Sequence, residues 1–330
     1  MQTIWEMGIN LILSIQGLGG WLEGPMEFIS FLGTEDFFML VLPVLFWCVD
    51  NRLGLKVGFI LLAGSTINDA FKLAMHGPRP YWFSPAVHGY AAESSFGVPS
   101  GHSSSAVEVW GMLAANLKRG WAWAVAVGVI FLIGFSRMFL GVHFPHDVLL
   151  GWLLGTLVLW LTLRLWDPVA AWLKRRTTLG QILIGLGFSL LLVVPSLFSH
   201  AWLQANWQMP AAWLANAAAA VPGADAPNPV SLEGPISNAG TIFGLAVGLA
   251  LLARSGGYQT RGVWWKQLLR LLVGIAGVLV IRYGLKAVFP EGETLLPLAL
   301  RYLRYALIGA WVAGAAPWLF IRLRLARGGE

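Results

Sequence analysis

Residues 121–140 read WAWAVAVGVIFLIGFSRMFL, a run of twenty residues in which Arg137 is the only charged side chain. A helix that spans a bilayer needs about 20 predominantly apolar residues, and this stretch meets that length. Trp121 and Trp123 stand at its beginning, where the amphipathic indole favours the membrane–water interface. The stretch therefore predicts a transmembrane helix.

Eight more apolar stretches surround this one, so the pattern governs the whole chain. Of the 330 residues, 57% are apolar and 12% charged, whereas average soluble domains have about 45–50% and about 25%. The nine predicted spans are residues 36–49, 55–75, 103–117, 121–140, 148–166, 180–199, 238–253, 268–289 and 304–321. The composition excludes an ordinary cytosolic enzyme and predicts an all-α, polytopic membrane helical bundle with about nine transmembrane helices.

The first part of the chain, residues 1–34, has a different pattern. Gln2, Glu6, Asn10 and Ser14 recur every four residues among apolar neighbours, which is typical of an amphipathic helix lying in the membrane interface. The first twenty residues contain no Lys or Arg, which argues against a secretory signal peptide.

The basic residues indicate how the spans are oriented. The formal net charge is +6, but the basic residues flank apolar stretches, so they indicate topology and not a nucleic acid partner. With nine spans, fifteen of the 22 Lys and Arg residues fall on one side, which we predict to be cytoplasmic. The N-terminus is then outside and the C-terminus cytoplasmic. The seven exceptions on the outer side are Lys72, Arg79, Arg137, Arg282, Lys286, Arg301 and Arg304.

Three of these exceptions belong to short clusters that together suit a phosphate group. The clusters are Lys72-x6-Arg79-Pro80, Pro99-Ser100-Gly101-His102 and Ser136-Arg137-x5-His143-x3-Asp147. Three cations suit an anion with several oxygens, and arginines can hold phosphate through paired donors. Gly101 permits close approach of the backbone and Ser100 offers a hydroxyl, both just before a predicted helix whose N-terminus favours an anion.

Two histidines add what such a phosphate cradle lacks, namely a nucleophile and a proton donor. Asp147 lies four residues after His143, and Pro145 between them indicates the start of a helix. The Asp147 carboxylate can therefore reach one imidazole nitrogen and leave the other free to attack phosphorus. The sequence contains one cysteine and no cluster of carboxylates that would hold a metal, so we predict neither a metal nor another cofactor.

The ordered set of motifs resembles the type 2 phosphatidic acid phosphatase superfamily, in its membrane branch. The overall layout and the sequences Arg79-Pro80-Tyr81-Trp82 and His143-Phe144-Pro145-His146 are similar to those of glucose-6-phosphatases. The resemblance implies that Lys72, Arg79 and Arg137 bind the phosphoryl oxygens, with hydrogen bonds from Ser100 and Gly101. It implies that His143 is the nucleophile, Asp147 its orienting partner, and His102 the acid that protonates the leaving oxygen.

The leading functional hypothesis is a membrane phosphatase acting on a lipid-linked phosphate ester or diphosphate at the outer, non-cytoplasmic face. Hydrolysis of a soluble sugar phosphate and non-hydrolytic transfer of phosphate between lipids stay open, and an anion transporter ranks below them. On this hypothesis the chain divides into an interfacial segment (1–34), a phosphatase core (35–166), a basic cytoplasmic linker (167–179) and a C-terminal transmembrane extension (180–330). Its partners are then membrane lipids and a phosphorylated small molecule; no sequence feature indicates an oligomeric state.

The remaining exceptions, Arg282, Lys286, Arg301 and Arg304, lie in the predicted extension. One explanation is that they extend to anionic lipid headgroups at the membrane surface. The other is a second basic wall that helps to hold a diphosphate or a charged headgroup of the substrate.

Overall fold

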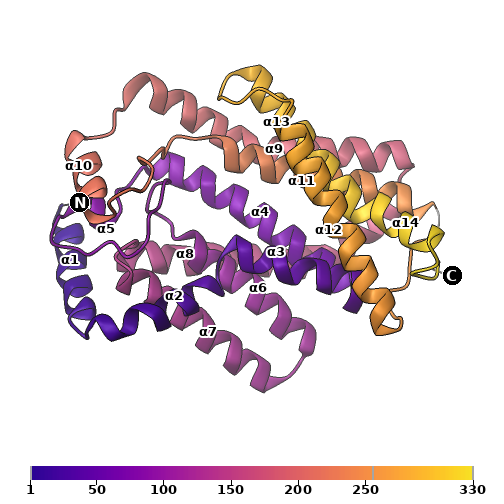
Figure 1. Cartoon of the computed structure of the whole chain (residues 1–330), viewed down its shortest axis with the longest axis horizontal. Helices are drawn as coiled ribbons and strands as arrows, with labels where there is room; N and C mark the ends of the chain where they lie inside the picture. The colour runs from indigo at the N-terminus through magenta and orange to yellow at the C-terminus, as the bar shows by residue number, and fades with distance from the viewer. Residues whose placement is uncertain (1, 255, 329–330) are drawn as a thin grey trace. The chain divides into compact units, whose positions relative to one another are not determined.

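The computed structural model describes residues 2–254 and 256–328, and in these ranges every regular element is a helix (Figure 1). Tyr258 and Gly328 also form an isolated antiparallel β-bridge. The predicted all-α class is confirmed. Residue 1 of the predicted interfacial segment and residues 255, 329 and 330 of the predicted extension lie outside the described residues.

Seven helical stretches among the described residues are long and apolar enough to cross a membrane. They are Asn51–Phe83, Gly120–Phe139, Pro145–Lys174, Thr178–Asn206, Glu233–Ala253, Trp264–Lys286 and Leu295–Arg322. The predicted count of nine is not confirmed, because residues 36–49 and 103–117 form shorter helices. The first of these is α3 (Glu35–Val44), which contains Pro43 and continues into a π-helical turn (Leu45–Val49). The second is α6 (Gly101–Leu117), which ends where Lys118 takes a left-handed conformation.

Contacts between residues divide the chain into two compact units. The first unit comprises Met1–Phe38, Ile67–Trp160 and Ser196–Ser231, and the second comprises Met39–Thr66, Leu161–Pro195 and Leu232–Glu330. Three long helices contribute a part to each unit: α4 (Asn51–Met75), α8 (Pro145–Lys174) and α9 (Thr178–Asn206).

The N-terminal helix of the first unit, α1 (Gln2–Gln16), packs against α7 (Gly120–Phe139) and the short α5 (Pro80–Phe83). Its Ile12 is buried while Ile4 is exposed, so the apolar side chains are divided between the bundle and the surface. Gln16 fixes the end of the helix by donating to the carbonyl oxygens of Phe139 and His88, at 2.9 and 2.8 Å. A helix is present as predicted, but its position in a membrane interface stays a prediction.

Close backbone packing between α8 and α6 positions the start of α6. A Cβ atom on Gly151 of α8 would lie 2.5 Å from the Ser100 carbonyl oxygen, and one on Gly155 would lie 2.6 Å from that of Ser104. These distances are too short for any side chain, so glycine at both positions lets the two backbones touch. The first turn of α6 is thereby held beside the first turn of α8. The rest of this unit includes α2 (Glu23–Phe31), preceded by a 3-10 turn (Gly20–Leu22), and α10 (Ala211–Ala220), which packs on α5.

The second unit is built around α11 (Glu233–Ala253) and α13 (Leu295–Ala310), which lie side by side (Figure 1). Glycines of α11 make the contact: a Cβ atom on Gly240 would lie 2.5 Å from the Tyr302 carbonyl oxygen of α13, and one on Gly248 would lie 2.9 Å from that of Ala310. Small residues let helix backbones approach closely in membranes. The pair is therefore packed backbone to backbone along much of its length.

Helix α12 (Trp264–Lys286) joins this pair through a smaller contact. A π-helical turn (Trp311–Ala315) and α14 (Ala316–Arg322) continue α13. In that turn the Trp311 indole nitrogen donates to the Gly274 carbonyl oxygen of α12 at 2.9 Å. Gly274 also lies against the buried Trp47 ring, with no room for a side chain.

Candidate active site

The polar cluster of the first unit begins with two cations placed by the end of α4 and the start of α5. Lys72 lies in the last turn of α4, and Arg79 is the N-cap residue of α5, directly before Pro80. Proline suits the first position of a helix because its missing N–H is unsatisfied there in any case. The Lys72 Nζ and the Arg79 Nη2 both donate to the Ser95 hydroxyl, at 2.8 and 3.1 Å. One serine therefore brings the two cations together.

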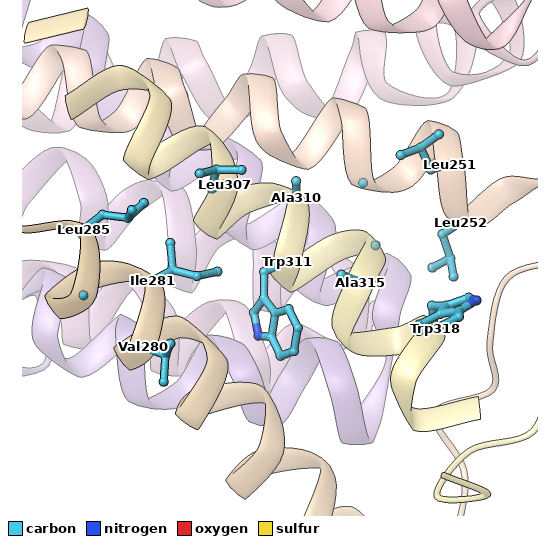
Figure 2. Close-up of a pocket in the computed structure, with 13 residues that line it drawn as sticks. Leu251, Leu252, Val280, Ile281, Leu285, Leu307, Ala310, Trp311, Ala315 and Trp318 are labelled. Carbon is cyan, nitrogen blue, oxygen red and sulfur yellow. The ribbon is translucent and has the colours of Figure 1, made fainter. Parts of the chain in front are cut away.

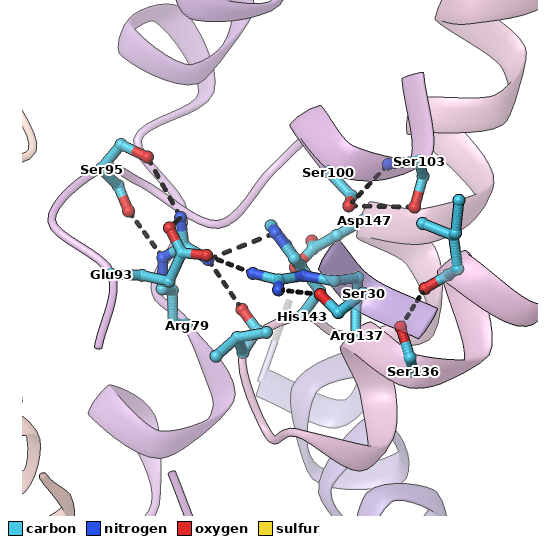
Figure 3. A network of polar contacts seen from close by, with 12 residues as sticks. Ser30, Arg79, Glu93, Ser95, Ser100, Ser103, Ser136, Arg137, His143 and Asp147 are labelled. Atoms are coloured by element: carbon cyan, nitrogen blue, oxygen red, sulfur yellow. Dashed lines mark hydrogen bonds and ion pairs between the residues drawn. The ribbon is translucent and has the colours of Figure 1, made fainter. Parts of the chain in front are cut away.

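Arg79 is fully buried and forms the centre of the site (Figure 3). Its Nε donates to the Ser95 carbonyl oxygen at 2.7 Å, and its Nη1 donates to that of Val142 at 3.0 Å. The same Nη1 lies 3.2 Å from the Nε2 atom of His143. Because these hydrogen bonds fix the guanidinium, its Nη1 atom is held in place beside the His143 ring.

His143 lies in the turn between α7 and α8, with its two ring nitrogens in different surroundings. The Nδ1 atom faces the Asp147 Oδ2 atom at 3.3 Å, and that oxygen also accepts from the Phe144 backbone N–H at 2.9 Å. Arginine has only donors, so its contact with Nε2 requires that Nε2 carry a lone pair. We therefore assign the proton to Nδ1 and the lone pair to Nε2.

The charge state of His143 follows from its surroundings. Burial, and then the positive charges of Arg79, Arg137 and Lys72, hold the pKa of His143 well below its ordinary value. Each of these causes disfavours the imidazolium form. The ring is therefore neutral at neutral pH.

Ser100 and Gly101 lie at the N-terminus of α6. The Ser100 hydroxyl caps the helix by accepting from the Ser103 N–H at 3.4 Å, and the Ser100 N–H donates to the Asp147 carbonyl oxygen at 2.9 Å. A Cβ atom on Gly101 would lie 3.9 Å from the Lys72 Nζ. The Asn68 Oδ1 atom would lie closer still, at 3.5 Å, so the first turn of α6 lies beside both Asn68 and Lys72.

Arg137, in the last turn of α7, completes the set of cations. Its Nη1 donates to the Ser30 hydroxyl of α2 at 2.7 Å, and its Nη2 is paired with the Glu93 carboxylate. The second Glu93 oxygen lies 3.3 Å from the Arg79 Nη2. Glu93 therefore bridges the two arginines (Figure 3).

Glu93 is an anion bound where the cations converge. Burial alone would raise the pKa of Glu93, but the charges of Arg79, Arg137, His102 and Lys72 outweigh it and hold the pKa far below its ordinary value. The carboxylate is therefore ionised. It is the counter-ion that Arg79 and Arg137 share in this structure.

His102 follows Gly101 in the first turn of α6, and its imidazole lies in the field of Arg137, Glu93, Lys72 and Arg79. The structure therefore brings together all eight residues predicted for the catalytic and phosphate-binding groups. These are Lys72, Arg79, Ser100, Gly101, His102, Arg137, His143 and Asp147, all of which belong to the first unit.

Sequence reasoning missed three residues of this cluster: Ser30, Glu93 and Ser95. Each is a common polar residue outside the three motifs. The sequence offers one indication for Glu93. It lies nine positions before His102, and no other carboxylate lies between it and the Ser-Gly-His cluster.

The four other basic residues that were singled out form a separate group in the second unit. Arg282, Lys286, Arg301 and Arg304 line one pocket, together with Glu233 and Glu291. They share no residue with the cluster around Arg79. In residues 2–254 and 256–328 no group of three or more His, Cys, Asp or Glu side chains could hold a metal ion.

Helices of membrane-spanning length define an integral membrane protein, and it contains a buried cluster of cations beside a histidine backed by a carboxylate. Comparison with known proteins gives its family. Residues 53–169 match the model of the PAP2 superfamily, and residues 236–328 match that of the PAP2 superfamily phosphatase transmembrane extension. The chain belongs to the PAP2 superfamily, as its motifs predict.

Two curated relatives are enzymes named for phosphate removal. Phosphatidylglycerophosphatase B of Bacillus subtilis (strain 168) is 32% identical over 154 residues, which cover 43% of this chain and 73% of that protein. Glucose-6-phosphatase 3 of Bos taurus is 28% identical over 186 residues, which cover 49% of this chain and 54% of that protein. The chain therefore spans about half the length of this glucose-6-phosphatase.

A solved structure is also similar. The crystal structure of a transmembrane PAP2-type phosphatidylglycerolphosphate phosphatase from Bacillus subtilis aligns with a TM-score of 0.45 and 27% identity. The alignment covers 51% of this chain and 89% of that one.

Proposed function

We propose that this protein is a membrane phosphatase that hydrolyses a phosphate ester or diphosphate through a phosphohistidine, without a metal. The observation that carries the proposal is the orientation of His143. Its Nε2 lone pair faces the buried guanidinium of Arg79 at 3.2 Å, while its Nδ1 is held by Asp147 at 3.3 Å. A phosphoryl group bound by Arg79 would lie within reach of that lone pair.

In the first step the phosphoryl group replaces Glu93 on the cations, and Lys72, Arg79 and Arg137 hold its oxygens. The His143 Nε2 lone pair attacks phosphorus, a P–N bond forms and the P–O bond to the leaving group breaks. His102 gives its proton to the leaving oxygen. Asp147 stabilises the positive charge that develops on the His143 ring.

In the second step His102 accepts a proton from water, and the water oxygen attacks the phosphohistidine. The P–N bond breaks, its electrons return to His143, and inorganic phosphate is released. Arginines placed around the phosphoryl oxygens stabilise the charge in both transition states.

The substrate class that we propose is a lipid-linked phosphate. One relative, phosphatidylglycerophosphatase B of Bacillus subtilis, is named for a phospholipid substrate. The match to glucose-6-phosphatase 3 favours a soluble sugar phosphate as the second candidate. Because an alcohol can replace water in the second step, transfer of phosphate between lipids is a third outcome.

We also propose the membrane topology predicted above, in which α6 is one of nine spans. This helix has 17 residues, at the lower end of the range of about 17–25 residues for a span. Helix α6 packs against α7. The N-terminus of α6 and the C-terminus of α7 both lie at the cluster around Arg79, so the two helices run antiparallel. If α7 crosses the bilayer, α6 returns through the same depth. Residues 36–49 would supply the ninth span.

This arrangement supports a non-cytoplasmic active site. Lys118 and Arg119 lie at the turn of the α6–α7 hairpin, opposite the site, where positive charge marks the cytoplasmic side. The N-terminus is then outside and the C-terminus cytoplasmic. We retain the proposed division at residues 34, 166 and 179, in which the core at 35–166 carries the catalytic residues.

The experiment that tests the function is phosphate release by purified protein from matched lipid and sugar phosphates. We expect the highest kcat/KM on a lipid phosphate, with ³²P from the labelled substrate trapped on wild-type protein by acid quench. Trapping should disappear in His143→Ala. Undiminished trapping in that variant, or no phosphate release from any substrate, would contradict the proposal.

The headgroup role of Arg282 and Lys286 has a separate test. If they hold the substrate, neutralising both should raise KM for a charged lipid phosphate and leave p-nitrophenyl phosphate unaffected. Equal losses on the two substrates would indicate destabilisation of the fold instead.

A further inference from the structure

Two pockets of the second unit adjoin each other along α12 and α13. The larger, of about 800 Å³, has apolar walls that include Leu251, Ile281, Leu285, Leu307, Trp311 and Trp318. The smaller, of about 290 Å³, contains Arg282, Lys286, Arg301 and Arg304.

The two pockets are neighbours on both helices, because residues that line one lie next to residues that line the other. On α12 Leu285 lines the apolar pocket, and the next residue, Lys286, lines the basic one. On α13 Arg304 lines the basic pocket, and Leu307, one turn later, lines the apolar one. The apolar cleft and the basic pocket therefore lie next to each other.

The depth of the cleft corresponds to one leaflet of a bilayer. Figure 2 shows Leu307 and Leu285 toward one end and Leu252 and Trp318 toward the other. From Leu307 to Trp318, at 1.5 Å per residue, the wall extends about 16 Å. The hydrocarbon core of a bilayer is about 30 Å thick, so this is close to half of it. Val280, which lines the cleft, is 71% exposed, so the cleft is open to the surface of the second unit.

The basic pocket has more positive than negative charge and contains an unsatisfied donor. Of its two carboxylates, Glu233 is paired with Arg301 at 2.9 Å and Glu291 with Lys286 at 3.3 Å. Arg304 is only 8% exposed, and its Nε finds no hydrogen-bond partner among the described residues. A buried guanidinium N–H without an acceptor is costly, so an anion in this pocket would stabilise it.

We infer that the second unit binds one anionic phospholipid, with its phosphate in the basic pocket against Arg304 and an acyl chain in the apolar cleft. The basic pocket supplies the selection for negative charge, and the cleft supplies the selection for a chain. None of these residues belongs to the first unit, so the inference does not depend on the proposed phosphatase activity.

The lipid also explains why basic residues stand on the predicted outer side of this half. If these basic residues only extended to headgroups at the membrane surface, we would expect all of them to be exposed, and none to be buried in a pocket. Arg304 is that member, and it lies one helical turn from the apolar cleft.

The test is native mass spectrometry of the full-length protein in detergent, titrated with phosphatidylglycerol, phosphatidylcholine or glycerol 3-phosphate. Two variants disrupt the two halves of the site. Arg304→Gln removes the buried charge. Gly284→Leu fills the cleft, since Gly284 lines it and has no neighbouring atom within 4 Å of the Cβ position.

Two control variants match these changes. Arg254→Gln neutralises an exposed arginine of the same unit, outside both pockets. Gly187→Leu makes the same change on α9 at another position with free space around the Cβ atom. The controls account for a general loss of charge and for the effect of leucine on a helix.

We expect wild-type protein to bind one phosphatidylglycerol, and each site variant to bind it about tenfold or more weakly. Arg304→Gln loses one charged contact, and Gly284→Leu occupies the space of the acyl chain. Both controls should bind as the wild type does. Gly284→Leu binding as well as wild type would overturn the inference even if Arg304→Gln fails to fold. Equal affinity for phosphatidylcholine, or for glycerol 3-phosphate, would overturn it too, because charge or chain would then play no part.

Discussion

Replacing Glu93 with Gln tests whether the anion cluster is the phosphate site. In the structure the Glu93 carboxylate is bound to Arg79 and Arg137. A phosphoryl group that uses the same arginines must displace it, so substrate binding includes the cost of breaking these contacts. The glutamine side chain has nearly the same shape and keeps hydrogen-bond acceptance, but it has no charge.

The size of the effect follows from the ion pairs. Two unit charges at the 3.3 Å between Glu93 and Arg79 attract each other by about 5 kcal/mol at an effective dielectric constant of about 20. Desolvation offsets much of this, and coupling between close charge pairs is about 1.5–7 kcal/mol in measured cases. Because glutamine still accepts hydrogen bonds, we expect the lower part of that range, about 1.5–3 kcal/mol. Phosphate should then bind about 10- to 100-fold more tightly to Glu93→Gln.

The assay is competitive inhibition by inorganic phosphate with p-nitrophenyl phosphate as substrate, together with thermal unfolding at increasing phosphate. Without ligand the variant should be less stable than wild type, since two buried arginines lose their counter-ion. Phosphate should restore more of its stability than it adds to the wild type. Phosphate inhibition that is unchanged or weaker in Glu93→Gln would refute the assignment of this cluster as the phosphate site.

Four further predictions concern the same site. His143→Ala should abolish turnover and leave the unfolding temperature close to wild type, whereas more than a few per cent residual activity would remove His143 from the nucleophile role. Asp147→Asn should lose activity by a smaller factor, which steady-state kcat would show, because it disturbs the tautomer and not the attacking atom. The pKa of Glu93 is depressed in the folded protein. The ionised carboxylate therefore stabilises the fold above the pKa of about 4.3 that a glutamate has in the unfolded chain, and this stabilisation is lost as the pH falls below that value. The loss, measured by unfolding between neutral and acid pH, should be absent in Glu93→Gln. Gly151→Ala should reduce kcat, because its Cβ would lie 2.5 Å from the Ser100 carbonyl oxygen and displace the start of α6; activity equal to wild type would show that α6 can shift freely.

The helices and the motif residues could be predicted because both are local properties of the sequence. The run 121–140 has the length and composition of a span, and α7 covers Gly120–Phe139. The motif residues lie at the ends of such runs, and span ends that share one membrane face can meet. The short α6 is different, because its 17 residues are at the lower limit of length for a span and it is not among the helices that are long and apolar enough to cross a membrane.

The contacts that join distant segments could not be predicted. Ser30 receives a hydrogen bond from Arg137, 107 residues away in sequence. Arg301 is paired with Glu233, 68 positions earlier. Periodicity shows which side of one helix is apolar, but not which loop folds over its end. Glu93 was missed for that reason, since only the folded chain brings it to the two arginines.

The glycine contacts between α11 and α13 have a mechanical consequence. Two helices that touch backbone to backbone, as α11 and α13 do at Gly240 and Gly248, are expected to move together as one rigid unit. Helix α12 is held beside this pair by the hydrogen bond from the Trp311 indole to the Gly274 carbonyl oxygen. The last turns of α12 extend beyond this contact. We therefore expect that any widening of the proposed lipid cleft displaces the end of α12, from Val280 to Lys286, and leaves α11 and α13 in place.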